Sequence, residues 1–209
     1  MTDEITVFSD YVCPFCYLGR RSLDEYQDER DEELEIDWHP FDLRSNQRDE
    51  DGEIVRESGH DDEYYEQAKQ NVERLREEYG ADEMQADLVD NVDSLDAQVA
   101  SYYVKEHYDY ETWLAFDRSL FAALWEEGRD IGDADVLAEL AEDAGVPAEE
   151  VRDAVSDAAL REELKASFEE AHRMGVTGVP TFAYDGHAAR GAVPPAQLER
   201  LVEGATAEP

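Results

Sequence analysis

The sequence predicts an α/β fold in which a block of helices is inserted between two groups of strands. Near the N-terminus, β-branched and aromatic residues form two strand-like segments on either side of one helix-like segment. From residue 60 onward the spacing of apolar residues changes from two to about 3.6, which is typical of helices. Strand-like segments return after residue 175. The expected order is therefore β-α-β, then helices, then ββα.

The first group consists of two strands and one helix, expected at residues 5–8, 17–26 and 34–41. In the second strand the apolar side chains alternate toward one face: Leu34, Ile36 and Trp38. His39 falls on the opposite face by the same alternation. An acid–base role for His39 therefore stays open.

Residues 44–59 are polar, punctuated by glycine and without apolar periodicity, so we expect a connection and a domain boundary there. Several segments with helical spacing follow. We interpret the aromatic residues of these segments as core residues rather than as the lining of a cofactor pocket. Residues 113–125 are apolar on nearly every side, which predicts a buried helix. The other expected helix faces are Tyr65, Ala68, Val72, Leu75 and Tyr79; Leu95, Val99, Tyr102 and Tyr103; Val136, Leu137, Leu140 and Ala141; Val151 and Val155.

The last group begins after a helix expected at residues 160–174. Residues 175–184 form a turn that leads into a strand, and Asp185-Gly186 is a hairpin signal before a returning strand at 187–191. Pro194-Pro195 is typical of the start of a helix, and apolar residues follow it at helical spacing. This group supplies the ββα part of the fold.

The chain contains two cysteines, and they lie three positions apart in Cys13-Pro14-Phe15-Cys16. The pair follows the first strand and precedes the first helix. With Cys13 as the N-cap residue, Pro14 occupies the first helical position, where its missing N–H costs nothing. We expect the Cys13 sulfur to face the free N–H groups of Phe15 and Cys16, which favours the thiolate and makes Cys13 the attacking sulfur.

This spacing leaves three interpretations open: a redox pair, half of a structural zinc site, or two inert core cysteines. Zinc requires about four ligands, and the sequence contains no second Cys-x-x-Cys and no His-x₃₋₅-His. We therefore favour a redox-active disulfide between Cys13 and Cys16, with no metal and no other cofactor.

The charge balance is strongly acidic, with 55 acidic and 18 basic residues and a net charge of −37. The electric field of so negative a protein repels nucleic acid and anionic membranes, so neither is an expected partner. We expect a chain adapted to molar salt, where the Debye length falls to roughly 3 Å. No secretory signal and no apolar run of about 18 residues is visible, which indicates a cytoplasmic location.

Several motifs carry a resemblance to a known family. They are Cys13-Pro14-Phe15-Cys16-Tyr17, Trp38-His39-Pro40-Phe41, Gly178-Val179-Pro180-Thr181-Phe182, Gly191-Ala192-Val193-Pro194, and the run 120–145 with Gly128-Arg129-Asp130-Ile131. On these motifs the sequence resembles DsbA-family thiol–disulfide oxidoreductases over essentially its whole length, and in particular the cytoplasmic FrnE-like branch. Secreted DsbA proteins typically have Pro-His between the cysteines, whereas this chain has Pro14-Phe15.

The resemblance implies a thioredoxin fold with an inserted all-helical domain. We expect the thioredoxin-fold domain at residues 1–43 and 160–209 and the helical domain at residues 44–159. The resemblance also implies that Pro180 is cis and packs beside Cys13. The candidate site residues are then Cys13 and Cys16 as catalytic residues, Val179, Pro180 and Phe15 as substrate-binding residues, and Pro14 as a supporting residue.

Three functions of different classes follow from these residues. The first is a disulfide oxidoreductase that acts on thiols or disulfides of proteins or small molecules and depends on a recycling partner. The second is a glutathione-dependent transferase or isomerase of the kappa or hydroxychromene-carboxylate type, although those proteins carry a serine at the position of Cys13. The third is a polypeptide-binding holdase. We favour the first because both cysteines are present.

Overall fold

The computed structural model describes residues 3–49, 54, 62–85 and 92–206. The chain divides into two compact units. The sheet unit comprises residues 1–43, 59–82 and 171–209, and the helical unit comprises residues 44–58 and 83–170.

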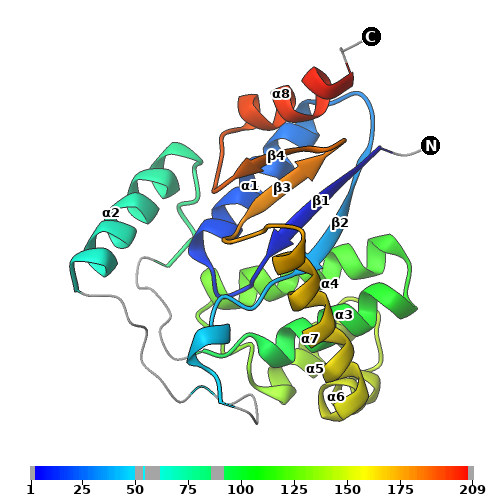
Figure 1. The fold of residues 1–209 in the computed structure, drawn as a ribbon. Helices are drawn as coiled ribbons and strands as arrows, with labels where there is room; N and C mark the ends of the chain where they lie inside the picture. The colour runs from blue at the N-terminus through cyan, green and yellow to red at the C-terminus, as the bar shows by residue number, and fades with distance from the viewer. Residues whose placement is uncertain (1–2, 50–53, 55–61, 86–91, 207–209) are drawn as a thin grey trace. The chain divides into compact units, whose positions relative to one another are not determined.

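The sheet unit contains four strands in the order β2-β1-β3-β4 (Figure 1). Their bounds are β1 (Asp3–Ser9), β2 (Leu34–Pro40), β3 (Thr181–Tyr184) and β4 (His187–Arg190). Strand β1 is parallel to β2 and antiparallel to β3, and β3 is antiparallel to β4. A parallel βαβ half joined to an antiparallel ββα half is the expected thioredoxin arrangement.

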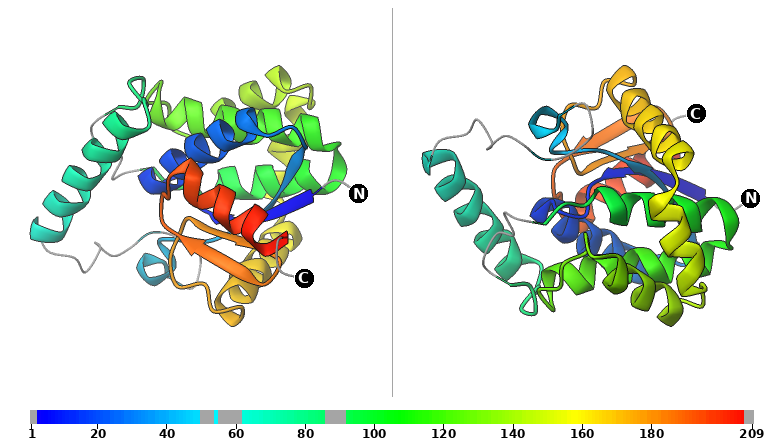
Figure 2. Two further views of the ribbon diagram at one scale, coloured as in Figure 1. Left: turned by 90° about the horizontal axis from the view of Figure 1, so that it is seen from above. Right: turned by 90° about the horizontal axis from the view of Figure 1, so that it is seen from below.

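Two helices of this unit, α1 (Pro14–Glu29) and α8 (Pro195–Thr206), pack against each other, and α8 also contacts β3 and β4 (Figure 2). The inward side of β2 is buried as the alternation predicts, at Leu34, Ile36 and Trp38. Trp38 also donates a hydrogen bond from Nε1 to Ser9 Oγ (2.9 Å). The end of β1, from which the chain leads into α1, is therefore anchored on β2.

The hairpin between β3 and β4 turns at Asp185 and Gly186, as expected. Both residues have positive φ, 45° and 80°, which is the conformation of a two-residue hairpin turn. On the opposite side of the sheet from Phe182, a small cluster forms around Phe8, Phe41, Ala171 and Val176. Val179 packs against this cluster, so the start of the β3 segment rests on core residues.

The helical unit holds α3 (Leu95–His107), α4 (Tyr110–Trp125), α5 (Ala134–Asp143), α6 (Ala148–Ser156) and most of α7 (Ala158–Arg173). Helix α4 is buried along most of its length, as its apolar composition predicts. Gly145 follows α5 with a φ of 89°, and Pro147 occupies the N-cap position of α6. A short 3-10 helix, η1 (Ser45–Gln47), precedes Arg48, whose guanidinium holds Asp93 through two hydrogen bonds of 2.6 Å.

The units differ from the expected domain boundaries in two places. Helix α2 (Asp62–Glu78) belongs to the sheet unit, although we expected it in the inserted domain. The reason is contact with α1 and with the segment after β4: Arg21 donates to Gly80 O (3.2 Å), and Tyr79 donates to Ala192 O (2.7 Å). Helix α7 is continuous through residue 160, and the division falls near Ala171. Residues 50–53 and 55–59 of the expected connection lie outside the described residues.

Among the helices that the structure describes, none has both the length and the apolar character that crossing a membrane requires.

Candidate active site

The two cysteines lie where β1 passes into α1. Strand β1 ends at Ser9, and Cys13 is the N-cap residue of α1 with extended backbone angles of φ −88° and ψ 114°. Pro14 is the first residue of the helix, as the sequence predicts. Both cysteines are free thiols, with exposed fractions of 3% for Cys13 and 2% for Cys16. They therefore occupy the positions of a dithiol that can close into a disulfide.

The Cys13 side chain makes no capping hydrogen bond with its own helix. The expectation that the Cys16 N–H is free is wrong, whereas the expected orientation of the sulfur toward the start of the helix stays a prediction. The Cys13 carbonyl instead accepts the Cys16 N–H (3.0 Å), and the sulfur donates to the carbonyl oxygen of Val179 (3.7 Å). The Cys13 carbonyl thus serves the Cys16 N–H, and the Cys13 sulfur contacts a group outside the helix.

Cys16 lies in the first turn of α1, behind Cys13. Burial raises the pKa of the Cys16 thiol well above its ordinary value, and the hydrogen bond and charge of Cys13 raise that pKa further. A contact with the Asp10 backbone acts in the opposite direction. At neutral pH Cys16 is therefore a protonated thiol, which must lose its proton before it can attack a disulfide.

The loop that faces Cys13 contains the Val179–Pro180 peptide bond, which is cis. Hydrogen bonds hold this loop on both sides: Thr181 Oγ1 donates to Gly178 O (2.8 Å), and the Gly191 N–H donates to Pro180 O (2.8 Å). Pro180 is buried, whereas Val179 is half-buried. The result is a fixed carbonyl, that of Val179, directed at the Cys13 sulfur.

Asp10 is a further site residue that we did not single out from the sequence. It is fully buried, and its carboxylate accepts the N–H of Val12 (3.3 Å) and the N–H of Leu43 (2.9 Å). Its carbonyl oxygen accepts the Cys13 N–H (3.1 Å). Asp10 thus ties the turn before Cys13 to the segment after β2. An aspartate directly after an apolar strand, at the start of a turn, is the sequence signal that could have indicated this role.

The remaining candidates occupy the rim of the site. Pro14 and Phe15 are half-buried at the start of α1. His39 lies in β2 with its ring 4.7 Å from the ring of Phe8, and its Nδ1 is 3.2 Å from Pro40 O. His39 therefore packs beside the cluster that supports Val179. Within residues 3–49, 54, 62–85 and 92–206, no group of three or more His, Cys, Asp or Glu side chains could hold a metal ion.

The fold and the cysteine pair define a class: a thioredoxin fold with Cys-x-x-Cys at the start of its first helix. Residues 4–203 match the family model of the DSBA-like thioredoxin domain, and the chain belongs to this family. It is 29% identical over 191 residues to the uncharacterized protein YwbO of Bacillus subtilis (strain 168), covering 87% of this chain and 86% of that one.

Three solved structures share the fold. A probable DsbA oxidoreductase, SCO1869 from Streptomyces coelicolor, has a TM-score of 0.80 at 24% identity, with 99% of this chain and 91% of that one covered. A 2-hydroxychromene-2-carboxylate isomerase has a TM-score of 0.75 at 22% identity, with 97% and 94% covered. The cytosolic disulfide reductase DsbM from Pseudomonas aeruginosa, solved with GSH, has a TM-score of 0.58 at 21% identity, with 95% and 92% covered. At these identities the likeness establishes the fold.

Proposed function

We propose that this chain is a thiol–disulfide oxidoreductase of the FrnE-like branch, in which Cys13 attacks and Cys16 resolves. One observation carries the proposal. The Cys13 sulfur lies beside the Val179 carbonyl, and Cys16 is buried one helical turn behind it. The family supports a thiol–disulfide chemistry, and the presence of both cysteines favours complete exchange over a single-cysteine reaction.

In the first step, the Cys13 thiolate attacks one sulfur of a substrate disulfide. A mixed disulfide forms, and the other substrate sulfur leaves as a thiolate that takes a proton from water. Cys16 then loses its proton and attacks the Cys13 sulfur. This second attack forms the Cys13–Cys16 disulfide and releases the second substrate thiol. Two electrons pass from the dithiol to the substrate, and the reverse sequence oxidises a substrate dithiol.

The Val179 carbonyl has a part in both steps. In the reduced protein it accepts the Cys13 S–H. Once Cys13 is a thiolate or a disulfide, that donor is gone, and the carbonyl is free to accept an N–H from the substrate backbone. Pro180 has no N–H to compete for a partner. The half-buried Phe15 and Pro14 form the rim against which the substrate packs.

We place this activity in the cytoplasm, in molar salt, with a separate thiol or disulfide partner that recycles the Cys13–Cys16 pair. A lone Cys-x-x-Cys in a reducing compartment is suited to catalysis rather than to a structural disulfide. The neighbour DsbM is described as a cytosolic disulfide reductase, which supports this assignment by analogy of fold. No nucleic acid and no membrane is required by the chemistry.

The test is a trapping experiment with Cys16→Ala and its matched control Cys13→Ala. The Cys16→Ala protein should attack substrate disulfides but fail to release them, because the resolving thiol is missing. It should accumulate adducts from a cell lysate that migrate slowly on a non-reducing gel and disappear with reductant. Cys13→Ala should form none. Absence of adducts with Cys16→Ala, when the wild type reduces a model disulfide, would overturn the assignment of Cys13.

A second candidate function is glutathione-dependent isomerase or transferase activity. The similarity of fold to a hydroxychromene-carboxylate isomerase favours it. The same two variants distinguish the candidates, since a glutathione-dependent reaction would survive Cys16→Ala. A holdase would suppress aggregation of a client even after both cysteines are replaced.

A further inference from the structure

One segment of this acidic chain is almost free of acidic residues. Between Glu170 and Glu199, Asp185 is the one acidic residue, whereas a uniform spread of the 55 acids would place about seven there. The same segment contains Arg173 and Arg190. It comprises the end of α7, the loop with Val179, both strands of the hairpin and the start of α8. The acid-poor segment therefore coincides with half of the candidate active site.

The arginines of this region differ from those elsewhere. Arg173, Arg190 and Arg200 make no ion pair with a carboxylate in the part of the chain that the structure describes. Arg190 donates to Gly175 O (3.4 Å), and Arg200 donates to Ala196 O (3.1 Å). Eight arginines in other described regions are paired with a carboxylate, among them Arg30 with Asp3, Arg48 with Asp93 and Arg161 with Asp96. Three cations without a carboxylate partner are thus gathered in a protein with a threefold excess of acids.

Their position relative to Cys13 follows from the sheet. Thr181 pairs with Phe8 on one side and with Arg190 on the other, so Arg190 lies at the end of the sheet where β1 leads to Cys13. The Arg190 contact with Gly175 connects β4 to the turn that precedes Val179. Met174, next to Arg173 in that turn, is 63% exposed, which adds an apolar side chain to the same turn.

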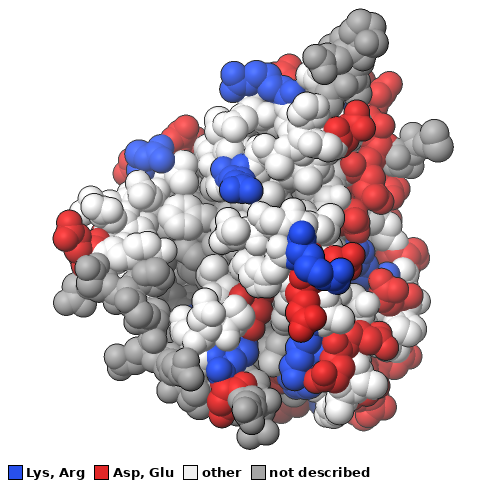
Figure 3. Space-filling view, in the orientation of Figure 1, with Lys and Arg blue, Asp and Glu red and all other residues white. Residues whose placement is uncertain are grey.

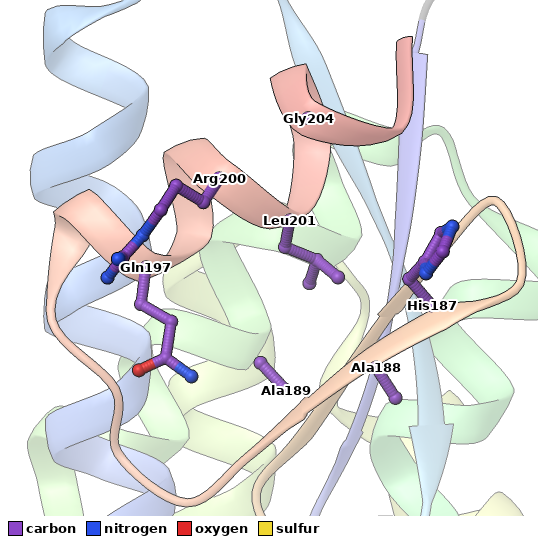
Figure 4. Close-up of a pocket in the computed structure, with 7 residues that line it drawn as sticks. All are labelled: His187, Ala188, Ala189, Gln197, Arg200, Leu201 and Gly204. Atoms are coloured by element: carbon purple, nitrogen blue, oxygen red, sulfur yellow. The ribbon is translucent and has the colours of Figure 1, made fainter. Parts of the chain in front are cut away.

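We call the exposed residues of 172–178 and 187–190 the acid-poor face. Figure 3 shows a broad uncharged area with isolated blue groups where β3 and β4 lie in Figure 1, and acidic groups gather in other places. Beside β4 is a cavity of about 460 Å³ whose polar lining includes His187, Gln197 and Arg200, and none of its described lining residues is a carboxylate (Figure 4). By contrast, the hollow near Arg30 is lined by Asp3, Glu29 and other acids.

We propose that the acid-poor face docks an acidic polypeptide and presents its disulfide to Cys13. This inference rests on the proposed function and names the substrate class of that site. A net charge of −37 repels an acidic partner at long range, but molar salt shortens the range of that repulsion to a Debye length of roughly 3 Å. Contacts between arginine and carboxylate then decide which surface an acidic chain can touch. The face extends from the turn after α7 across two strands to the cavity at α8, which is more surface than a small thiol covers.

The test compares three peptides of equal length that carry the same disulfide and differ only in flanking residues: aspartate, serine or lysine. At molar potassium chloride, the wild type should reduce the aspartate peptide with the highest kcat/KM. The double variant Arg173→Gln/Arg190→Gln should lose about three- to tenfold in kcat/KM for that peptide, because it loses two exposed charge pairs and each such pair is weak. Its rate with the serine peptide should not change.

Arg152→Gln is the matched control, since Arg152 is an exposed arginine of the helical unit that is paired with Asp135. It should leave all three rates unchanged. Equal losses for the aspartate and serine peptides would overturn the proposal. The proposal would also be overturned if the double variant lost activity with oxidised glutathione but not with the peptides.

A binding measurement separates failure of this inference from failure of the proposed function. Fluorescence anisotropy with a cysteine-free aspartate peptide reports docking without chemistry. If no peptide disulfide is reduced but the aspartate peptide still binds and loses affinity in the double variant, the proposed chemistry is wrong and the docking face stands. If the peptides are reduced but the double variant binds the aspartate peptide as the wild type does, the docking face is wrong.

Discussion

A Cβ atom on Gly19 would lie 3.0 Å from Cγ of Pro180 and 3.1 Å from Cζ of Phe182. Gly19 is buried in α1, one turn after Cys16, so the missing side chain lets the helix approach the loop that carries the Val179 carbonyl. Glycine in a helix interior costs roughly 0.5–1 kcal/mol relative to alanine. That cost is explained here by the close approach of α1 and Pro180.

We therefore expect Gly19→Ala to destabilise the protein and not to stabilise it. The helix gains from alanine, but forcing a methyl group into this contact costs about 1–3 kcal/mol. The free energy of unfolding from urea titration measures the net loss. The control is Gly204→Ala in α8, where no atom of the described residues lies within 4 Å of the new methyl group and a gain is expected. A gain of equal size in both variants would contradict the role of Gly19.

Asp10 should contribute to stability more than its turn position suggests. Asp10→Ala leaves the N–H groups of Val12 and Leu43 without their acceptor, and we expect a loss of about 2–3 kcal/mol in the free energy of unfolding. Asp10→Asn, which keeps one acceptor oxygen, should lose less. Asp109→Ala is the control, because Asp109 also accepts a backbone N–H, from Thr112, at an exposed helix start. If both alanine variants lose the same amount, burial does not strengthen the Asp10 contacts.

The second chemical step should be limited by deprotonation of Cys16. Burial raises the pKa of this thiol, so only a small fraction is thiolate at neutral pH. We expect the rate of mixed-disulfide resolution to rise about tenfold per pH unit, because only the thiolate attacks. Rapid acid quenching of the mixed disulfide at a series of pH values measures this rate. A rate that is flat between pH 7 and pH 9 would contradict the assignment.

The fold and the cysteine pair could be predicted from the sequence because both depend on local patterns. Strand alternation, the Asp185-Gly186 turn and proline at the first position of α1 each act over a few residues, and the structure has all three. The Gly-Val-Pro motif likewise identified the loop that faces Cys13, through resemblance to a family.

The features that escaped prediction depend on contacts between distant segments. The sulfur of Cys13 turns toward Val179, which is 166 positions away, instead of capping its own helix. Helix α2 belongs to the sheet unit because the residues that follow it form hydrogen bonds there. Gly80 accepts one from Arg21 of α1, and Tyr79 donates one to Ala192 after β4. Gly19 lies in an otherwise ordinary helical pattern, and its importance appears only when Pro180 is placed beside it. Periodicity carries no information about such pairs.

In the helical unit, Glu150 should make the stability depend on pH at both extremes. Its carboxylate accepts hydrogen bonds from Tyr108 (2.7 Å) and Tyr103 (2.8 Å). The hydrogen bond to Glu150, with a smaller effect of burial, raises the pKa of Tyr108 to about 12, and the hydrogen bond from Tyr108 lowers the pKa of Glu150.

The Glu150 carboxylate adds to the free energy of unfolding at pH values above the pKa that Glu150 has in the unfolded chain. This stabilisation is lost as the pH falls through the lower pKa that Glu150 has in the folded protein. The raised pKa of Tyr108 adds to the free energy of unfolding below pH 10, and this stabilisation is lost as the pH rises toward about 12. Glu150→Gln should return the Tyr108 pKa toward 10, measured by tyrosinate absorbance, with Tyr108→Phe identifying the signal. An unchanged titration curve in Glu150→Gln would show that this contact does not set the pKa.

Salt should raise the stability of the whole protein. The net charge of −37 acts between like charges spread over the chain, and this repulsion destabilises the compact state. Raising the ionic strength from 0.1 M to 1 M shortens the Debye length from about 10 Å to about 3 Å, which removes most of it. We expect the free energy of unfolding, followed by circular dichroism in urea, to increase steadily over a potassium chloride series.

Sulfate at the same ionic strength is the control, because screening depends on ionic strength whereas exclusion from the protein surface depends on the ion. The screening explanation predicts a substantial gain in chloride as well as in sulfate. A protein that is equally stable in millimolar and in molar chloride would contradict adaptation to high salt.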